Sequence, residues 1–295
     1  MRSYLLVSVI VALFFFHMSA SAQSLLDMLE EEAEPVTEFT YATFKTTRIV
    51  NGQSIENPPA GELKFIVGHH FGRLNQGAYN LWGLDQSTIR LGFEYGINDR
   101  LAVAIGRSSY EKTFDGFAKY KILRQSTGKR IMPVSLSVFS GIYLNSLEWS
   151  NPERTNYFSS RLAYVHQVLL ARKFSNTFSL QITPTVVHKN LVEKNNDPND
   201  IFAIGYGGRV RLTNRITLNA EYFQLLTSET KNNFNNMLSV GFDLETGGHV
   251  FQLHFTNAQP MFDRAFITET QGDWLKGDIY FGFNIVRVFS LYDSD

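Results

Sequence analysis

Apolar and polar residues alternate along most of this chain in stretches of about ten residues. In residues 88–97 the apolar set falls on one face, and glycine or charged residues fall on the other: Ile89, Leu91, Phe93, Tyr95 and Ile97 against Arg90, Gly92, Glu94 and Gly96. Because successive side chains of a β-strand point to opposite faces, this pattern predicts a strand with one apolar and one polar face. Asn98-Asp99 then forms a tight turn, and the alternation resumes at Leu101, which predicts a hairpin.

The same unit recurs about twelve times between Leu63 and Phe289. Clear copies occupy residues 178–186, 202–212, 216–222, 238–245, 251–256 and 279–285. The alternation is less regular in residues 63–69, 114–124, 134–143 and 157–170, where we also expect strands.

The lengths of the connections provide a second signal. Short turns are expected at Asn98-Asp99, Ser175-Asn176, Thr213-Asn214 and Gly247-Gly248, with a longer one at residues 125–130. Longer links fall between them, at residues 71–85, 108–112, 145–155, 190–199, 227–233 and 257–275. Short and long connections therefore alternate, as in outer-membrane barrels with short periplasmic turns and longer extracellular loops. An even number of strands returns both termini to the periplasm.

The beginning of the chain predicts export. Arg2 is followed by an apolar run from Tyr4 to Phe16 and by Ala20-Ser21-Ala22, which together are typical of a cleaved secretory signal over residues 1–22. The run is too short to span a bilayer. The chain has no cysteine, which excludes a lipid-modified N-terminal cysteine, a disulfide framework and a thiolate metal site.

We therefore predict an all-β protein, a single antiparallel transmembrane β-barrel of about 12 strands over residues 61–295, located in the outer membrane. A soluble β-sandwich also has alternating strands, but its strands are usually only about five or six residues long. The 27 basic and 28 acidic residues leave a formal charge of −2 once Arg2 is removed with the signal, which argues against a nucleic-acid partner.

Residues 23–60 differ from the repeats, and we expect a periplasmic N-terminal segment. Leu25 to Glu34 reads as a short amphipathic acidic helix or as a disordered acidic tail, and is a candidate contact for a periplasmic partner. Residues 38–60 have three open alternatives: an extra strand, a plug inside the lumen, or a segment hanging in the periplasm.

No catalytic motif is present, so we expect no enzyme, and no cofactor or metal is expected because the histidines are scattered over different strands. The candidate functional residues are the inward-facing ones. These lumen-lining candidates are Arg90, Glu94, Lys119, Lys121, Arg209, Arg211, Glu221, Asp243, Glu245 and His254. They would either form two opposed walls of charge across a water-filled passage or pair across the lumen and close it.

Several motifs carry a resemblance to a known family: Asn51-Gly52-Gln53-Ser54, His70-Phe71-Gly72-Arg73, the run from Gly83 to Gly92, Gly106-Arg107-Ser108-Ser109-Tyr110, Lys112-Thr113-Phe114-Asp115-Gly116, Thr246-Gly247-Gly248-His249 and Gln252-Leu253-His254. With them the chain resembles a family of outer-membrane β-barrel proteins of Gram-negative bacteria catalogued as a domain of unknown function. The resemblance implies a membrane barrel and brings no substrate or catalytic residue.

Three functions are compatible with these patterns. The first is a narrow channel or porin for small polar solutes, in contact with outer-membrane lipid. The second is a lipid-acting barrel enzyme, in which serine, histidine and acidic groups would meet at the lipid-facing rim. The third is a closed structural or docking barrel that holds a periplasmic partner through Leu25 to Glu34.

Overall fold

The structure, a computed structural model, describes residues 36–192, 194, 197–246 and 249–291. The predicted signal (1–22), the acidic segment from Leu25 to Glu34 and the turn at Gly247-Gly248 lie outside these residues. No helix among the described residues is long and apolar enough to cross a membrane.

The chain divides into two compact units. The described part of the smaller unit consists of residues 36–38 and 126–131. It is built around a two-stranded sheet of β1 (Thr37–Phe39) and β6 (Ser126–Gly128). The sequence pattern had indicated only a turn at 125–130, because three residues are too few for alternation to be recognised.

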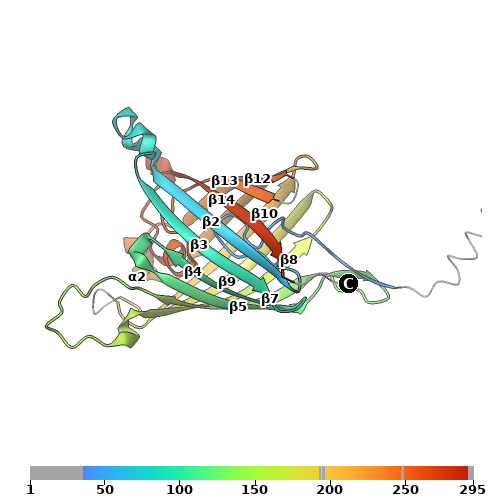
Figure 1. The fold of residues 1–295 in the computed structure, drawn as a ribbon, viewed down its shortest axis with the longest axis horizontal. Coiled ribbons are helices and arrows are strands. Elements are labelled where there is room, and N and C mark those ends of the chain that lie inside the picture. Colours follow the sequence, from blue (N-terminus) through green and yellow to red (C-terminus); the bar gives the residue numbers. More distant parts are fainter. Residues whose placement is uncertain (1–35, 193, 195–196, 247–248, 292–295) are drawn as a thin grey trace, which may run out of the picture. The chain divides into compact units, whose positions relative to one another are not determined.

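The larger unit is a closed antiparallel barrel (Figure 1). Its strands are β2 (Glu62–Arg73), β3 (Ser87–Gly96), β4 (Leu101–Ser108), β5 (Phe114–Leu123), β7 (Ser135–Leu144), β8 (Leu162–Lys173), β9 (Phe178–Lys189), β10 (Asp200–Arg211), β11 (Ile216–Leu225), β12 (Met237–Thr246), β13 (His249–Thr256) and β14 (Tyr280–Ser290). Each strand pairs with its neighbours along the chain, and β14 pairs with β2 to close the ring. The predicted antiparallel barrel of about twelve strands is confirmed.

The two faces of the strands have the predicted polarity. In β3, Leu91 and Phe93 are 45% and 43% exposed, whereas Arg90 and Glu94 are 5% and 2% exposed. The apolar row therefore covers the outside of the barrel and the polar row points inward, as expected for strands that contact lipid. Inward-facing residues of neighbouring strands lie opposite one another in the register. Buried Glu94 on β3 faces buried Ala104 on β4, and buried Lys119 on β5 faces buried Phe139 on β7.

One strand begins later than the sequence pattern indicated. The strand expected at 157–170 is β8, which starts at Leu162 after the short helix η4 (Phe158–Arg161). Arg161 explains the difference, because its guanidinium donates to the carbonyl oxygens of Asn145 (2.9 Å) and Leu147 and holds the preceding residues in a loop.

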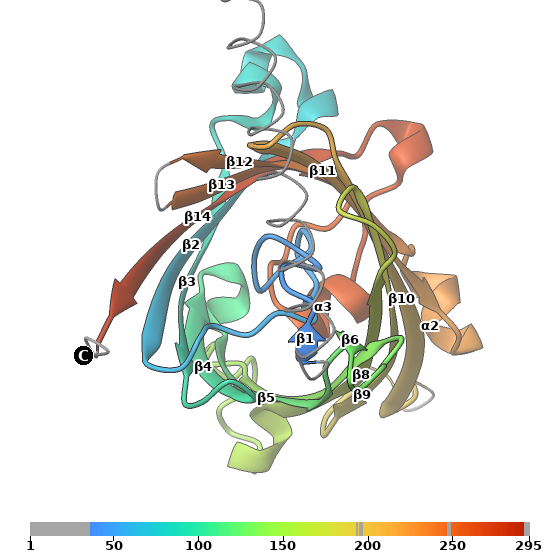
Figure 2. The ribbon, with the colours of Figure 1, turned by 90° about the vertical axis from the view of Figure 1, so that its right-hand side faces the viewer.

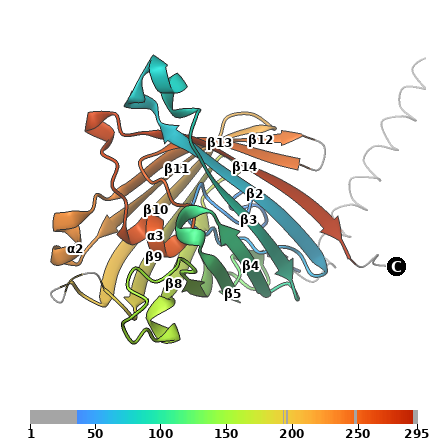
Figure 3. The same ribbon diagram turned by 60° about the vertical axis from the view of Figure 1, so that its left-hand side comes forward.

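The long connections all lie at one end of the barrel (Figure 3). They contain η1 (Leu74–Gln76), η2 (Ala78–Gly83), η3 (Tyr110–Lys112), η4, α2 (Ser228–Asn233), α3 (Asp263–Thr268) and η5 (Trp274–Lys276). In outer-membrane barrels the long loops are extracellular, so we refer to this as the extracellular end.

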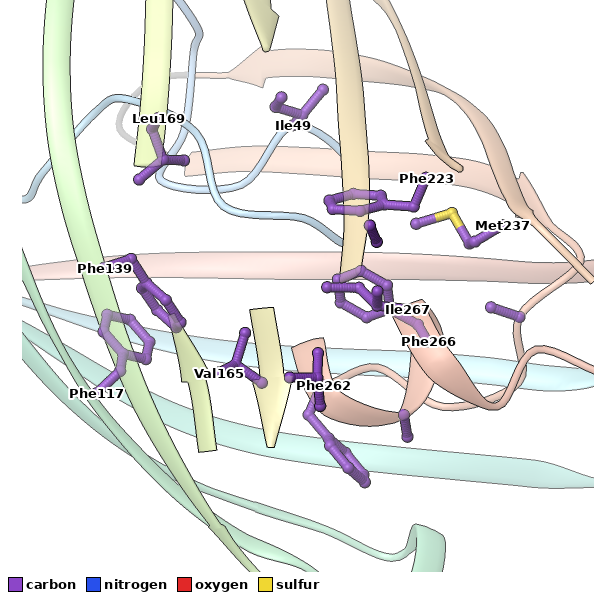
Figure 4. Packing of buried hydrophobic residues seen from close by; sticks show 14 of the residues in the cluster. Ile49, Phe117, Phe139, Val165, Leu169, Phe223, Met237, Phe262, Phe266 and Ile267 are labelled. Carbon is purple, nitrogen blue, oxygen red and sulfur yellow. The ribbon is translucent and has the colours of Figure 1, made fainter. Parts of the chain in front are cut away.

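Two segments occupy the interior of the barrel (Figure 2). One is residues 39–60, which precede β2 and which we call the plug segment. The other is part of the β13–β14 connection, residues 257–279, which we call the mouth loop: its helix α3 lies in the interior, whereas η5 is exposed at the extracellular end. Both contribute to one apolar cluster with the inner wall, in which Ile49 of the plug and Phe266 of the mouth loop lie near Phe223 of β11 (Figure 4).

Candidate functional site: the filled lumen and its outer vestibule

The plug segment reverses direction at a tight turn inside the lumen. The amide of Ile49 donates to the carbonyl of Gly52 at 2.8 Å, and Arg48 and Gln53 form an isolated antiparallel bridge across the turn. The amide of Ser54 donates to the carbonyl of Thr47 at 3.0 Å. These backbone bonds join residues of the turn to one another and not to a neighbouring strand, so the turn is not part of the barrel sheet.

The tip of this turn grips one carboxylate of the wall. Glu221 on β11 accepts hydrogen bonds from the amides of Val50 (3.3 Å), Asn51 (2.7 Å) and Gly52 (3.0 Å). Successive amides that converge in a turn form a site for an anion, which here is a wall side chain. A side chain at position 52 would crowd this contact, because a Cβ there would lie 3.0 Å from both Glu221 Oε2 and the Phe223 ring.

Basic residues of the wall bind backbone carbonyl groups of the plug and the carboxylate of Glu56. Lys119 on β5 is fully buried and donates to the carbonyl oxygens of Ser54 (3.0 Å) and Glu56 (2.6 Å). Lys121 lies 3.8 Å from the carboxylate of Glu56.

Charged residues of β10, β12 and β3 also bind the plug segment. Arg209 on β10 donates to the carbonyl oxygens of Ala42 and Thr43 (3.0 Å for Thr43), and Glu245 is paired with Lys45. Arg48 of the plug in turn lies 3.5 Å from Glu94 on β3. Six of the ten lumen-lining candidates are therefore in contact with the plug segment.

Amides of the wall add further bonds to the plug. Gln181, Gln252 and Asn284 donate to the carbonyl oxygens of Gln53 (2.7 Å), Ile49 (3.2 Å) and Val50 (3.2 Å).

The other four candidates have partners outside the plug segment. Arg90 forms a buried ion pair with Asp115 on β5. Asp243 accepts from Gln252 at 2.8 Å, and His254 lies with its Nε2 atom 2.8 Å from His70 Nε2. Arg211 donates to Asn214 Oδ1 at 2.7 Å at the end of its strand.

Of the two alternatives left open for the inward charges, the structure shows basic and acidic residues side by side on one part of the wall. The barrel places β10 beside β11, so Arg209 and Glu221 share one wall. This adjacency follows from the order of the strands, because β10 and β11 are consecutive in the chain. The inward charges are instead compensated locally by the plug and by neighbouring strands.

The mouth loop meets the plug in the middle of the lumen. Asp263 of α3 accepts from the hydroxyl of Tyr143 at 3.0 Å and lies 3.6 Å from Arg48 of the plug. His70 Nδ1 contacts the carbonyl of Gln259 at 2.9 Å, which fixes the start of the same loop to β2. Plug and mouth loop thus close the passage together.

Above the mouth loop lies a cavity of about 490 Å³, which we call the vestibule. Residues of the extracellular connections line it, including Tyr110, Trp149, Asp197, Glu229 and Phe234. Its floor is formed by α3 and the residues that follow this helix.

A chain of ion pairs crosses this floor. Arg264 pairs with Glu111 and, at 2.9 Å, with Glu269, which also accepts from Lys189 at 2.6 Å. Burial alone would raise the pKa of Glu269, but the charges of Arg264 and Lys189 outweigh it and lower the pKa below 4.5. Burial, together with Glu269 and Glu111, raises the pKa of Tyr110 to about 12.

Residues 44–289 match the sequence profile of the family described as "Membrane bound beta barrel domain (DUF5777)". The chain belongs to this family. The resemblance found in the motifs is thereby confirmed, and the barrel is a membrane-bound one. No curated protein matches the chain.

Solved porins have a similar arrangement of strands. The NanC porin is 9% identical with a TM-score of 0.49, over 77% of this chain and 98% of that one. The KdgM porin is 8% identical with a TM-score of 0.46, over 78% and 99%. Omp33 of Acinetobacter baumannii is 11% identical with a TM-score of 0.41, over 77% and 98%. Similarity at these identities and TM-scores does not indicate which solute, if any, passes through the barrel of this protein.

A polar pair lies on the outward-facing rows of β7 and β8. Ser140 Oγ on β7 lies 3.1 Å from His166 Nδ1 on β8, and the two residues face each other in the ladder. They sit in a largely apolar groove of about 630 Å³ whose lining includes Tyr120, Pro184 and Phe202. No carboxylate contacts His166 among the interactions of the described residues.

No group of three or more potential metal ligands converges among the described residues. Several residues of the site were not found from the sequence. Asp115 could have been found, because it shares the inward parity of Lys119. Arg48, Asn51 and Asp263 could not, since they lie outside the predicted barrel strands and the sequence left open whether residues 38–60 enter the lumen.

Proposed function

We propose that this protein is a gated, porin-like channel of the outer membrane that passes small polar solutes when the plug segment moves out of the lumen. The observation that carries the proposal is the chemistry of the wall behind the plug. Glu221, Lys119 and Arg209 are buried, and each forms hydrogen bonds with backbone groups of the plug.

A polar wall suits both a filled and a water-filled lumen. Buried charges are costly without partners, and in the closed barrel the plug supplies these partners. If the plug leaves, water can replace these partners. An entirely apolar wall would disfavour the open state strongly.

The number of strands supports a narrow passage. Barrels of about eight strands are filled by their own side chains, while those of about sixteen leave a wide aqueous channel. Twelve strands with the plug removed leave room for small solutes and exclude large ones.

The chain lacks cysteine, which allows a direct test by cross-linking. Asn51 Nδ2 of the plug lies 3.1 Å from Ser239 Oγ of the wall. The pair Asn51→Cys and Ser239→Cys, joined by a disulfide or a short bismaleimide, would hold the plug in place. In planar bilayers we expect channel openings from the reduced protein and their loss from the cross-linked protein. We also expect a large steady conductance when residues 43–56 are deleted.

A matched control uses the same wall residue. Ser239 Oγ also lies 2.8 Å from Thr256 Oγ1 on the adjacent strand, so Ser239→Cys with Thr256→Cys joins two wall positions and leaves the plug free. This pair should keep its openings after cross-linking. A correctly folded deletion variant without any conductance would refute the channel.

One observation favours the lipid-acting alternative. The Ser140–His166 contact lies in an apolar groove on the lipid-facing wall, where polar groups are costly and often functional. Against it, both residues lie in paired strands whose amides are used in the ladder, so no free pair of amides is at hand to stabilise an oxyanion. Release of fatty acid from phospholipid vesicles by the wild type, lost in Ser140→Ala, would support this second function.

A further inference from the structure

The vestibule has the dimensions of a ligand site. Its volume of about 490 Å³ falls within the usual range for pockets that hold small molecules. Five separate connections contribute to its lining, so it is a built concavity and not the surface of a single loop. By comparison, the cavity beside Arg48 and Asn284 in the lumen measures only about 20 Å³.

The basic groups of the vestibule are already engaged. Lys189 and Arg264 are paired with Glu269 and Glu111 in the floor. Arg161 donates to two backbone carbonyl groups, and its guanidinium lies 3.8 Å from the centre of the Trp149 ring. These three cations therefore have little capacity left for an anionic ligand.

The acidic groups exceed the basic ones. The described residues that line the cavity include the carboxylates Glu111, Glu148, Asp197, Glu229 and Glu269 against the bases Arg161, Lys189 and Arg264. Within the described part of the chain, Glu148 and Glu229 form no ion pair. The vestibule therefore has an excess of negative charge at its rim.

Aromatic and aliphatic side chains complete the lining. Tyr110, Tyr143, Trp149 and Phe234 line the cavity beside Leu147 and Val192. Aromatic faces attract cations, and they also bury an apolar ligand body. Carboxylates at the rim and aromatic rings beneath them are complementary to a molecule with one positively charged end and one apolar part.

We propose that the vestibule binds a small organic cation, such as an amine, an amidinium or a quaternary ammonium group attached to an apolar body. The binding site stands on the cavity and its charges and does not require a conducting barrel. That the same cation is the transported solute rests on the proposed channel function. Binding and conductance can therefore fail separately.

Calorimetric titration of the full mature protein in detergent tests the site. The probes are benzamidine, the neutral isostere benzamide and the anion benzoate. We expect saturable binding of benzamidine with a Kd below about 1 mM, weaker binding at high salt, and clearly weaker binding of the other two probes. Binding should persist when the plug is cross-linked, whereas conductance should not.

Two matched double variants locate the charge. Glu148→Gln with Glu229→Gln removes both rim carboxylates and should weaken benzamidine binding by about fivefold. Asp85→Asn with Glu153→Gln removes two acidic loop residues that do not line the vestibule and should leave affinity unchanged. Slower migration of each variant on gels after boiling verifies the folded barrel. Benzoate binding as tightly as benzamidine, no saturable binding, or equal losses in both double variants would overturn the proposal.

Discussion

The guanidinium of Arg48 lies 3.6 Å from the carboxylate of Asp263, although the two residues are separated by most of the chain. Arg48 belongs to the plug segment and Asp263 to the mouth loop, and both side chains are nearly fully buried. The next residue, Arg264, lines the vestibule. Helix α3 is therefore shared by the plug contact and by the vestibule floor, so a ligand that shifts α3 would also disturb the ion pair that holds the plug.

Removing the charge of Asp263 should loosen the plug. In Asp263→Asn, Arg48 retains only Glu94 as a charged partner, and breaking a buried pair costs about 3–5 kcal/mol. We expect more frequent channel openings in bilayers. Asp273→Asn, in the same loop but at an exposed ion pair with Lys276, is the control and should conduct like the wild type. Identical traces for both variants would show that the Arg48–Asp263 contact does not restrain the plug.

The turn at the plug tip should depend on the shape as well as the charge of Glu221. Glu221→Ala leaves the amides of Val50, Asn51 and Gly52 without their acceptor, and each unsatisfied buried amide costs about 1–3 kcal/mol. Glu221→Gln keeps one acceptor oxygen and should have a smaller effect. Amide hydrogen exchange of residues 49–52 should increase in the order wild type, Glu221→Gln, Glu221→Ala. Equal exchange rates in all three proteins would show that Glu221 does not restrain the turn.

Acid should release the mouth loop through Glu269. Its folded-state pKa lies below the ordinary value of 4.5, so its ion pairs with Arg264 and Lys189 stabilise the loop fully above pH 4.5. That stabilisation is lost as the pH falls through the lowered pKa and the carboxylate becomes protonated. Hydrogen exchange of residues 263–270, corrected for the intrinsic exchange rate at each pH, should therefore rise only in this acidic range. In Glu269→Gln it should already be high at neutral pH and change little on acidification.

A charge on the outer face should destabilise the barrel. Leu91 is 45% exposed on the lipid-facing row of β3, and arginine in a transmembrane strand costs about 2–4 kcal/mol near the bilayer midplane. Leu91→Arg should lower the free energy of unfolding in vesicles by an amount in this range. Tyr79→Arg, at a 96% exposed position in the extracellular connection, should have little effect. Equal stability of the two variants would place the apolar rows outside the bilayer.

The sequence predicts the structure of the barrel wall better than that of the plug segment and the mouth loop inside it. The alternation at Ile89, Leu91 and Phe93 predicted the outward row of β3, and Arg90 and Glu94 were correctly assigned to the interior. This succeeds because side-chain direction in a strand depends only on parity along the chain. The partner of each inward charge could not be obtained in this way, since Arg90 pairs with Asp115 and Glu94 with Arg48 across different elements.

By itself the sequence determined the class of fold, the twelve strands, the faces they present and the end that carries the long loops, because these features follow from local periodicity and the lengths of connections. Only the tertiary structure decided that residues 39–60 and helix α3 of the mouth loop lie inside the barrel and that Glu221, Lys119 and Arg209 bind backbone groups there. These contacts join residues more than sixty positions apart, and they arise from closure of the ring. Closure encloses polar wall groups that need hydrogen-bond partners, and the segments inside the barrel are those whose backbone supplies these partners.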